Sequence, residues 1–290
     1  MEKYDLIIVG AGPAGIFTAV ELLRHGSKKK MLLVEKGKPV EKRHCPKAEI
    51  GHCVNCRPTC AITTGFSGAG AFSDGKLNTG VNNPRIGWIL EQFVAAGARE
   101  DILYDAKPHV GTDVLLTVVQ NLRKRIISLG GEVRFNTQVT GLCTENGRLT
   151  GLKIADGTVI PCDRAVLAIG HSARDTFEML DASGVPMEPK PFAMGVRIEH
   201  PQALIDSIQY HCETRGEYLP AASYSLVSQE GGRGVYSFCM CPGGYVVATA
   251  SEEGRVVTNG MSYADRDGEN ANAALLVTVN PADFPYEGVL

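Results

Sequence analysis

The chain has 290 residues, 44% of them hydrophobic and 21% charged, a composition typical of a globular protein with one large domain or two ordinary ones. Its formal net charge is −3 at pH 7, and the run Lys28–Lys30 is short enough to be a solvated turn. These totals exclude a strongly basic nucleic-acid-binding protein, so we expect no nucleic-acid partner.

The apolar segment 4–23 does not have the form of a signal peptide or a membrane span. Asp5 interrupts its start, glycine and proline cluster in its middle, and Glu21 closes it. The nine cysteines are an odd number, which fits reduced thiols or a metal site better than a secreted disulfide framework. We therefore expect a cytoplasmic protein without a membrane partner.

The first 35 residues predict a β-α-β unit. Its parts are a buried strand, a glycine turn, a helix and a second buried strand, at Leu6–Val9, Gly10–Gly15, Ala14–Leu23 and Met31–Val34. The acidic residue Glu35 follows the second strand directly. A glycine motif alone is weak evidence for a dinucleotide site, but a glycine motif within this order of elements is stronger evidence for one.

The motif Gly10-x-Gly12-x-x-Gly15 indicates a dinucleotide site. Gly10 allows the tight turn, Gly12 lets the backbone approach a pyrophosphate, and Gly15 permits close packing of helix on strand. Glu35 can accept hydrogen bonds from ribose hydroxyls, and its charge would repel the 2′-phosphate of NADP. The predicted cofactor contacts here are Gly10, Ala11, Gly12, Pro13, Ala14, Gly15, Glu35 and Lys36.

Residues 36–82 form a long loop rich in glycine and cysteine, which indicates a functional or disordered segment. Its cysteines follow the spacing C-x7-C-x2-C-x3-C, at Cys45, Cys53, Cys56 and Cys60. Four thiolates so close together can hold an iron–sulfur cluster or Zn. The alternatives are a redox dithiol of Cys53 and Cys56, or thiols without a metal.

The end of this loop, 65–76, is rich in glycine. In glutathione-reductase-like flavoproteins, which this chain resembles at residues 165–170 as described below, a glycine-rich segment passes beside the flavin, and the resemblance implies that role for 65–76. Backbone N–H groups at Gly68 and Gly70 can approach the ring, and the side chains after them can hydrogen-bond its polar edge. These side chains are Ser73, Asp74 and Lys76. The alternative is a turn without a cofactor contact.

Two helices and a set of short strands follow. The expected helices are 84–97 and 112–129, and the expected meander strands are 132–135, 137–144, 149–154 and 159–162. A buried strand at Ala165–Ile169 ends in Gly170. From about Pro186 the pattern changes to longer and more polar strands, among them 223–228 and 235–239.

The strand Ala165–Ile169 with Gly170 resembles the second dinucleotide signature of glutathione-reductase-like flavoproteins, which also insert a meander before it. This resemblance favours FAD over NAD and adds Ala168 and Gly170 to the cofactor contacts, with Val139 near the adenine. No second Gly-x-Gly-x-x-Gly follows a strand, so a separate NAD(P)H domain is not indicated.

Five segments together resemble the uncharacterised FAD-dependent dehydrogenase family of bacteria: 5–15, 45–77, 111–113, 168–175 and 237–244. The resemblance covers essentially the whole chain and implies FAD binding and a redox role, without naming a substrate. Members of this family continue past the position of Leu290 and return to the first domain. The chain is therefore expected to be C-terminally truncated.

Three further residues are candidates for catalysis. Cys239 and Cys241 lie two apart in a predicted strand, so both face the same side and can line a substrate pocket or exchange electrons with a flavin. His171 follows the cofactor strand and can donate a proton. The alternatives are small apolar thiols in a half-buried strand and a structural histidine.

These patterns predict an α/β fold with a Rossmann-like FAD/NAD(P)-binding domain at 1–185, which includes an inserted β-meander. A second α+β substrate domain, expected to be incomplete, occupies 186–290. The predicted function is FAD-dependent hydride or electron transfer to a small-molecule substrate or an electron-transfer partner. The alternatives are an NAD-binding or thiazole-synthase-like protein, and a nucleotide-binding fragment without catalysis.

Overall fold

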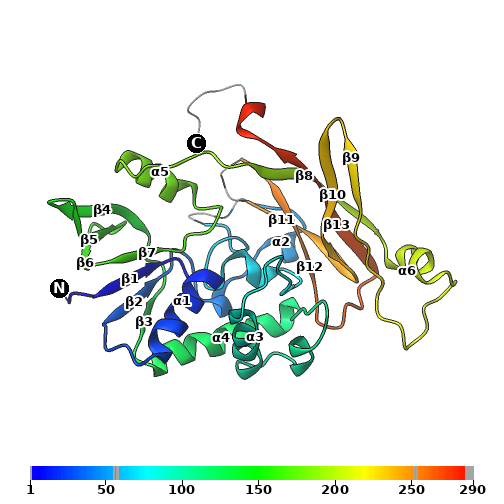
Figure 1. Ribbon diagram of the computed structural model, residues 1–290, viewed down its shortest axis with the longest axis horizontal. Coiled ribbons are helices and arrows are strands. Elements are labelled where there is room, and N and C mark those ends of the chain that lie inside the picture. Colours follow the sequence, from blue (N-terminus) through cyan, green and yellow to red (C-terminus); the bar gives the residue numbers. More distant parts are fainter. Residues whose placement is uncertain (1, 55, 57–58, 251, 253, 285–290) are drawn as a thin grey trace.

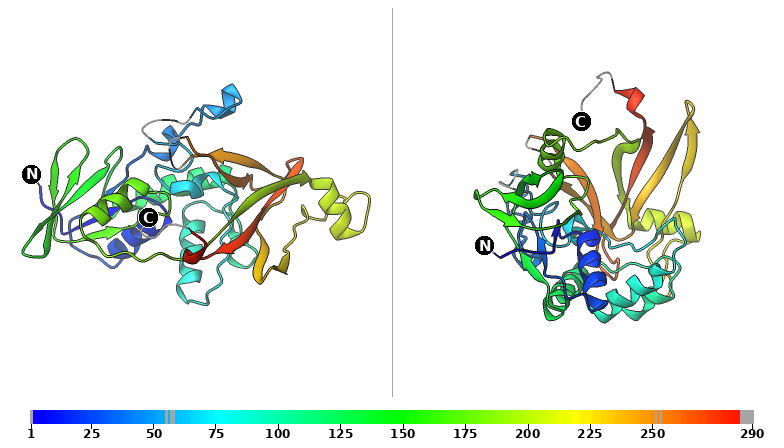
Figure 2. Two further views of the ribbon diagram at one scale, coloured as in Figure 1. Left: turned by 90° about the horizontal axis from the view of Figure 1, so that it is seen from above. Right: turned by 60° about the vertical axis from the view of Figure 1, so that its left-hand side comes forward.

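The computed structural model describes residues 2–54, 56, 59–250, 252 and 254–284. It is a mixed α/β structure with a parallel sheet and a separate antiparallel sheet (Figure 1). Seen from above, a small β-meander lies at one end of the molecule and the antiparallel sheet at the other (Figure 2). No helix among the described residues is long and apolar enough to cross a membrane.

The parallel sheet has the strand order β3-β2-β1-β7. Its strands are β1 Leu6–Val9, β2 Met31–Val34, β3 Glu132–Arg134 and β7 Ala165–Leu167. The two central strands are short runs of apolar residues because both faces of the sheet are covered. Ile8 and Leu33 face a core with helices, whereas Ile7 and Leu32 face a core with the meander.

Helices cover the first of these faces. They are α1 Pro13–Arg24 and α4 Thr112–Ser128, and α3 Arg85–Ala95 packs beside them (Figure 1). In α4 the buried residues recur at helical spacing, at Leu115, Val118, Val119, Leu122 and Ile126. The predicted helices 84–97 and 112–129 are therefore confirmed to within two residues at each end.

The antiparallel meander covers the second face. It consists of β4 Val139–Glu145, β5 Arg148–Ile154 and β6 Val159–Pro161. Asn146 and Gly147 both have positive φ, at 50° and 73°, which is the conformation of the tight turn that the Asn-Gly pair predicts. Leu152 and Ile160 are buried against the parallel sheet, so the meander closes that core.

The second sheet has the order β8-β13-β10-β9, all antiparallel. Its strands are β8 Phe192–Pro201, β9 Val227–Glu230, β10 Arg233–Cys241 and β13 Asn270–Val279. A hairpin of β11 Gly244–Thr249 and β12 Val257–Ser262 lies beside it, toward the helices (Figure 1). The expected strand 223–228 is wrong in its bounds, because the chain enters the sheet only at Val227.

Three more helices lie outside the two sheets: α2 Lys47–Ile50, α5 Arg174–Ala182 and α6 Gln202–Tyr210. α2 is a single turn within the long loop 36–82, and Figure 2 shows it projecting from the body of the molecule. α5 is the next element after β7, from which residues 168–173 separate it. It carries the segment after the predicted cofactor strand away from the parallel sheet (Figure 1).

Candidate functional site

The glycine turn after β1 contains three glycines with different structural roles. Gly10 has φ +99°, and a Cβ atom there would lie 2.4 Å from the Ala168 carbonyl oxygen. A Cβ at Gly15 would lie 1.9 Å from the Gly10 carbonyl oxygen. The fold itself therefore requires glycine at these two positions.

Gly12 is different. Its backbone is extended, with φ −73° and ψ −178°, and apart from its two chain neighbours no described atom lies within 4 Å of where its Cβ would be. Gly12 is the N-cap of the 12-residue helix α1, and no side chain among the described residues caps that end. The N-terminus of α1 therefore begins at a residue with open space beside it, and N–H groups in the first turn of a helix have no partner within the helix.

Glu35 stands at the end of β2, beside this turn, and only 6% of it is exposed. One carboxylate oxygen accepts a hydrogen bond from the Ala11 N–H at 2.9 Å, and the other accepts from the Gly37 N–H at 2.8 Å. Each oxygen keeps a second acceptor position. The structure therefore brings the acidic residue and the glycine turn together, as the sequence predicted.

The loop 65–72 lies against the glycine turn. The Ser67 N–H donates to the Ala11 carbonyl at 2.7 Å, and a Cβ at Gly68 would lie 3.5 Å from the Gly12 Cα. Gly70 and Ser73 line a small cavity of about 110 Å³ next to the start of α1, together with Pro13, Ser67 and Lys76. The predicted flavin-side segment is thus adjacent to the predicted pyrophosphate site.

Arg43 holds this loop in place, a role that the sequence reasoning missed. The side chain is buried, and its guanidinium donates to the carbonyl oxygens of Phe66 and Gly68 at 2.7 Å each. It also donates to Ala61 at 2.9 Å and Ile62 at 2.6 Å. Burial lowers the pKa of Arg43 to about 10. A single arginine therefore satisfies four carbonyl groups of an irregular segment.

The other predicted cofactor contacts lie at various distances from this centre. The Ala168 N–H donates to the Val9 carbonyl at 2.8 Å, which places the end of β7 against Gly10. Lys36 forms an ion pair with Asp175 of α5 at 2.9 Å. Val139 is buried in the core between the sheet and the meander. Gly170 has φ +73°, and this left-handed conformation favours glycine at the turn after β7.

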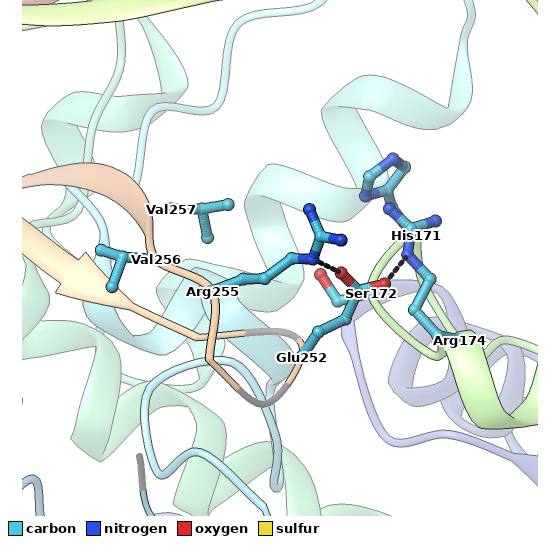
Figure 3. A pocket seen from close by; sticks show the side chains of 7 residues that line it. All are labelled: His171, Ser172, Arg174, Glu252, Arg255, Val256 and Val257. Atoms are coloured by element: carbon cyan, nitrogen blue, oxygen red, sulfur yellow. Dashed lines mark ion pairs between the residues drawn. The ribbon is translucent and has the colours of Figure 1, made fainter. Parts of the chain in front are cut away.

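His171 and the predicted catalytic cysteines do not line the same cavity. It is exposed and lines a cavity of about 570 Å³ between the start of α5 and the segment before β12 (Figure 3). Across this cavity Glu252 pairs with Arg174 at 3.2 Å and with Arg255 at 3.3 Å. Neither Cys239 nor Cys241 is among the residues that line it, so the three candidates do not share one cavity.

A buried carboxylate joins the flavin-side loop to the hairpin region. Asp74 is 1% exposed, and its side chain contacts Lys76 at 2.9 Å and Arg266 at 2.6 Å. It also accepts a hydrogen bond from the Ser262 hydroxyl. Burial opposes ionisation of Asp74, but the two cations and the hydroxyl outweigh it, so the pKa of Asp74 is lowered.

The predicted metal site is not supported. Among the described residues, which include Cys45, Cys53, Cys56 and Cys60, no group of three or more His, Cys, Asp or Glu residues is arranged to hold a metal ion. The physical reason is local: helix α2 lies between Cys45 and Cys53, so the loop does not gather these thiols into one cluster. Burial raises the pKa of the Cys60 thiol, but backbone hydrogen bonds, that of Ala250 first, outweigh it and lower the pKa overall.

Comparison with known protein families finds a similarity over the C-terminal third of the chain. Residues 191–290 match the model of a family described as FAD-dependent protein, C-terminal domain-like. The match supports the predicted similarity to FAD-dependent proteins.

The chain is also 49% identical, over 280 residues, to a protein of Clostridium beijerinckii described as an uncharacterized protein. The alignment covers 96% of this chain and 52% of the relative. The chain therefore spans about half the length of the curated relative that it matches.

Two solved structures are similar at low identity. Glycine oxidase from Bacillus cereus is 13% identical with a TM-score of 0.46, over 96% of this chain and 74% of that protein. A probable FAD-dependent monooxygenase from Pseudomonas aeruginosa is 13% identical with a TM-score of 0.45, over 97% of this chain and 62% of that protein. At these scores the similarities say nothing about the activity of this chain.

Proposed function

We propose that this chain binds FAD and belongs to a FAD-dependent oxidoreductase. The observation that carries the proposal is the open space at Gly12, at the N-terminus of α1 that no described side chain caps. Gly12 can take the pyrophosphate and Glu35 the adenosine ribose, because helix N-termini favour anions and carboxylates accept from hydroxyls. The similarity of residues 191–290 to FAD-dependent proteins supports FAD over NAD.

Under this proposal residues 1–185 form a Rossmann-like domain with an inserted meander, and residues 186–290 form the substrate domain. The bound flavin supplies hydride or electron transfer. The protein's own residues position it and exclude water. Arg43 holds the loop 61–68 by its four hydrogen bonds, and Asp74 fixes the following segment through Lys76 and Arg266. Rigid support of this kind preorganises a redox site.

Glu35→Arg is expected to weaken FAD binding. The substitution removes the acceptor for the ribose hydroxyls, and this loss should cost on the order of 1–3 kcal/mol of binding free energy. Affinity is measured by titration of flavin fluorescence.

Because Glu35 also accepts from the Ala11 and Gly37 N–H groups, Glu35→Gln is the matched control. It keeps one acceptor oxygen, so its affinity should fall between those of the wild type and Glu35→Arg. Thermal melting of both variants shows whether the glycine turn is still folded. Wild-type affinity in a folded Glu35→Arg variant would refute the role of Glu35.

A further inference from the structure

The end of β10 has an unusual backbone that brings two cysteines together. The pairing of β10 with β13 shifts between Phe238 and Cys241, which marks a β-bulge. At this bulge Cys239 has φ +48°, a left-handed conformation that a residue other than glycine adopts only under structural constraint. The Cys241 thiol turns back toward Cys239 and donates a hydrogen bond to its carbonyl oxygen. The bulge therefore packs the Cys241 thiol against Cys239, and both cysteines are free.

The two cysteines differ in their access to solvent. Cys239 is half-buried, whereas Cys241 is 0% exposed. The hydrogen bond from the Cys241 thiol to the Cys239 carbonyl oxygen measures 3.3 Å. An incoming molecule can thus reach Cys239 first, and Cys241 lies behind it.

Cationic and polar groups surround the pair. The Lys76 ammonium donates to the Cys241 sulfur at 3.4 Å, and the Arg197 guanidinium donates to the Cys239 carbonyl at 3.3 Å and to Asn272 at 2.6 Å. Gly260 lets these groups converge, since a Cβ there would lie 2.9 Å from the Cys241 sulfur. The Arg197 Nε and Asn272 Nδ2 atoms are buried, and within the described part of the chain neither has a hydrogen-bond partner.

These surroundings separate the acidities of the two thiols. The neighbouring Cys241 thiol lowers the pKa of Cys239 to about 6, with Lys76 and Arg197 contributing in the same direction. The neighbouring Cys239 and burial raise the pKa of Cys241. Reactive cysteines have this arrangement of a partly exposed thiolate beside positive charge, often with a second thiol to resolve the first product.

We propose that Cys239 and Cys241 are a redox-active dithiol that closes to an intramolecular disulfide and exchanges with low-molecular-weight disulfides. This chemistry needs no bound flavin and so goes beyond the proposed function. It also distinguishes this pair from Cys143 and Cys212, which have no second cysteine next to them in the sequence.

The exchange proceeds in two balanced steps. The Cys239 thiolate attacks one sulfur of a disulfide RSSR, the S–S bond breaks, and RS⁻ leaves a mixed disulfide on Cys239. The Cys241 thiol then loses its proton and attacks the Cys239 sulfur, which releases the second RS⁻. The released proton converts one RS⁻ to RSH. The pair loses two electrons and RSSR gains them.

The test uses the whole chain in glutathione buffers of stepped reduced-to-oxidised ratio, followed by thiol alkylation, trypsin digestion and mass spectrometry. Cleavage after Arg233 and Arg255 gives a peptide, 234–255, whose only cysteines are Cys239 and Cys241. As the buffer becomes more oxidising, we expect this peptide to change reversibly from its doubly alkylated form to an unalkylated disulfide form, which is lighter than the dithiol peptide by two hydrogens. The peptide 198–215, which holds only Cys212, is the internal control and should stay alkylated.

Variants test the order of attack. Cys241→Ser should accumulate a mixed glutathione disulfide on Cys239, because no thiol remains to resolve it, whereas Cys239→Ser should not.

The pH dependence of alkylation tests the acidity of Cys239. In the wild type the rate of Cys239 alkylation should rise with pH around a midpoint near pH 6, and Lys76→Met should move that midpoint upward. A peptide 234–255 that stays doubly alkylated at every ratio, or a Cys241→Ser variant without the mixed disulfide, would overturn the proposal.

Discussion

Gly12→Val is expected to abolish most FAD binding in a chain that still folds. The Gly12 backbone is extended, so valine can adopt its conformation, and apart from the two chain neighbours no described atom lies within 4 Å of the added Cβ. The side chain would instead occupy the space assigned to the pyrophosphate. Affinity should fall at least about a hundredfold, or about 2.7 kcal/mol. Loss of the preferred N-cap residue should cost no more than about 1 kcal/mol of unfolding free energy.

Gly15→Ala is the contrasting control. Its Cβ would lie 1.9 Å from the Gly10 carbonyl oxygen, so the helix and the glycine turn must separate before the residue fits. We expect this smaller substitution to lower the melting temperature more than Gly12→Val does. The two variants together distinguish Gly15, which the fold requires, from Gly12, which ligand binding requires. A folded Gly12→Val variant that binds FAD with wild-type affinity would contradict this assignment.

Asp74→Ala is expected to cause the largest loss of stability, about 3–5 kcal/mol of unfolding free energy at neutral pH. Its carboxylate is 1% exposed, and it pairs with Lys76 and Arg266, which are themselves only 29% and 20% exposed. Removing it leaves two partly buried cations without their shared counter-ion. It also takes the acceptor from the Ser262 hydroxyl. Urea denaturation measures the loss.

The stability that Asp74 supplies should depend on pH with a definite sign. The pKa of Asp74 is below its ordinary value of 3.8, since the cations and the hydroxyl outweigh burial. A lowered carboxylate pKa contributes stability above the unfolded-state value, and this stability is lost as the pH falls through the folded-state value. The difference between the wild type and Asp74→Ala should therefore shrink in acid. Asp74→Asn, which keeps an acceptor oxygen, should lose less at neutral pH. A loss below about 1 kcal/mol for Asp74→Ala would refute the network.

The local part of the candidate site could be predicted from the sequence. Two short apolar runs around a glycine turn specify a β-α-β unit within 35 residues, and the position of Glu35 follows from the end of the second strand. The Asn146-Gly147 turn and the long helix α4 could be predicted for the same reason, because the residues that specify each of them lie close together in the sequence.

The rest depends on contacts between distant residues. Asp74 contacts Ser262 and Arg266, which lie 188 and 192 residues away in the sequence. Residue spacing within one segment cannot predict contacts over such separations. Lys76 reaches Cys241 across 165 positions for the same reason. The loop cysteines show the converse: their close spacing allowed a shared metal site as one of three alternatives, and the described residues do not support it, because spacing does not fix where each thiol points. Nothing in the sequence distinguished Arg43 from the other cationic residues of this irregular loop, such as Lys42 and Lys47.

Titration of the purified chain with FAD, followed by the change in flavin fluorescence and by isothermal calorimetry, tests the central claim most directly. We predict saturable binding of one FAD per chain, release of the flavin on denaturation, and loss of binding in Gly12→Val. A chain that melts cooperatively and shows no FAD binding up to about millimolar concentration, the weak limit of specific affinity, would contradict the proposed function.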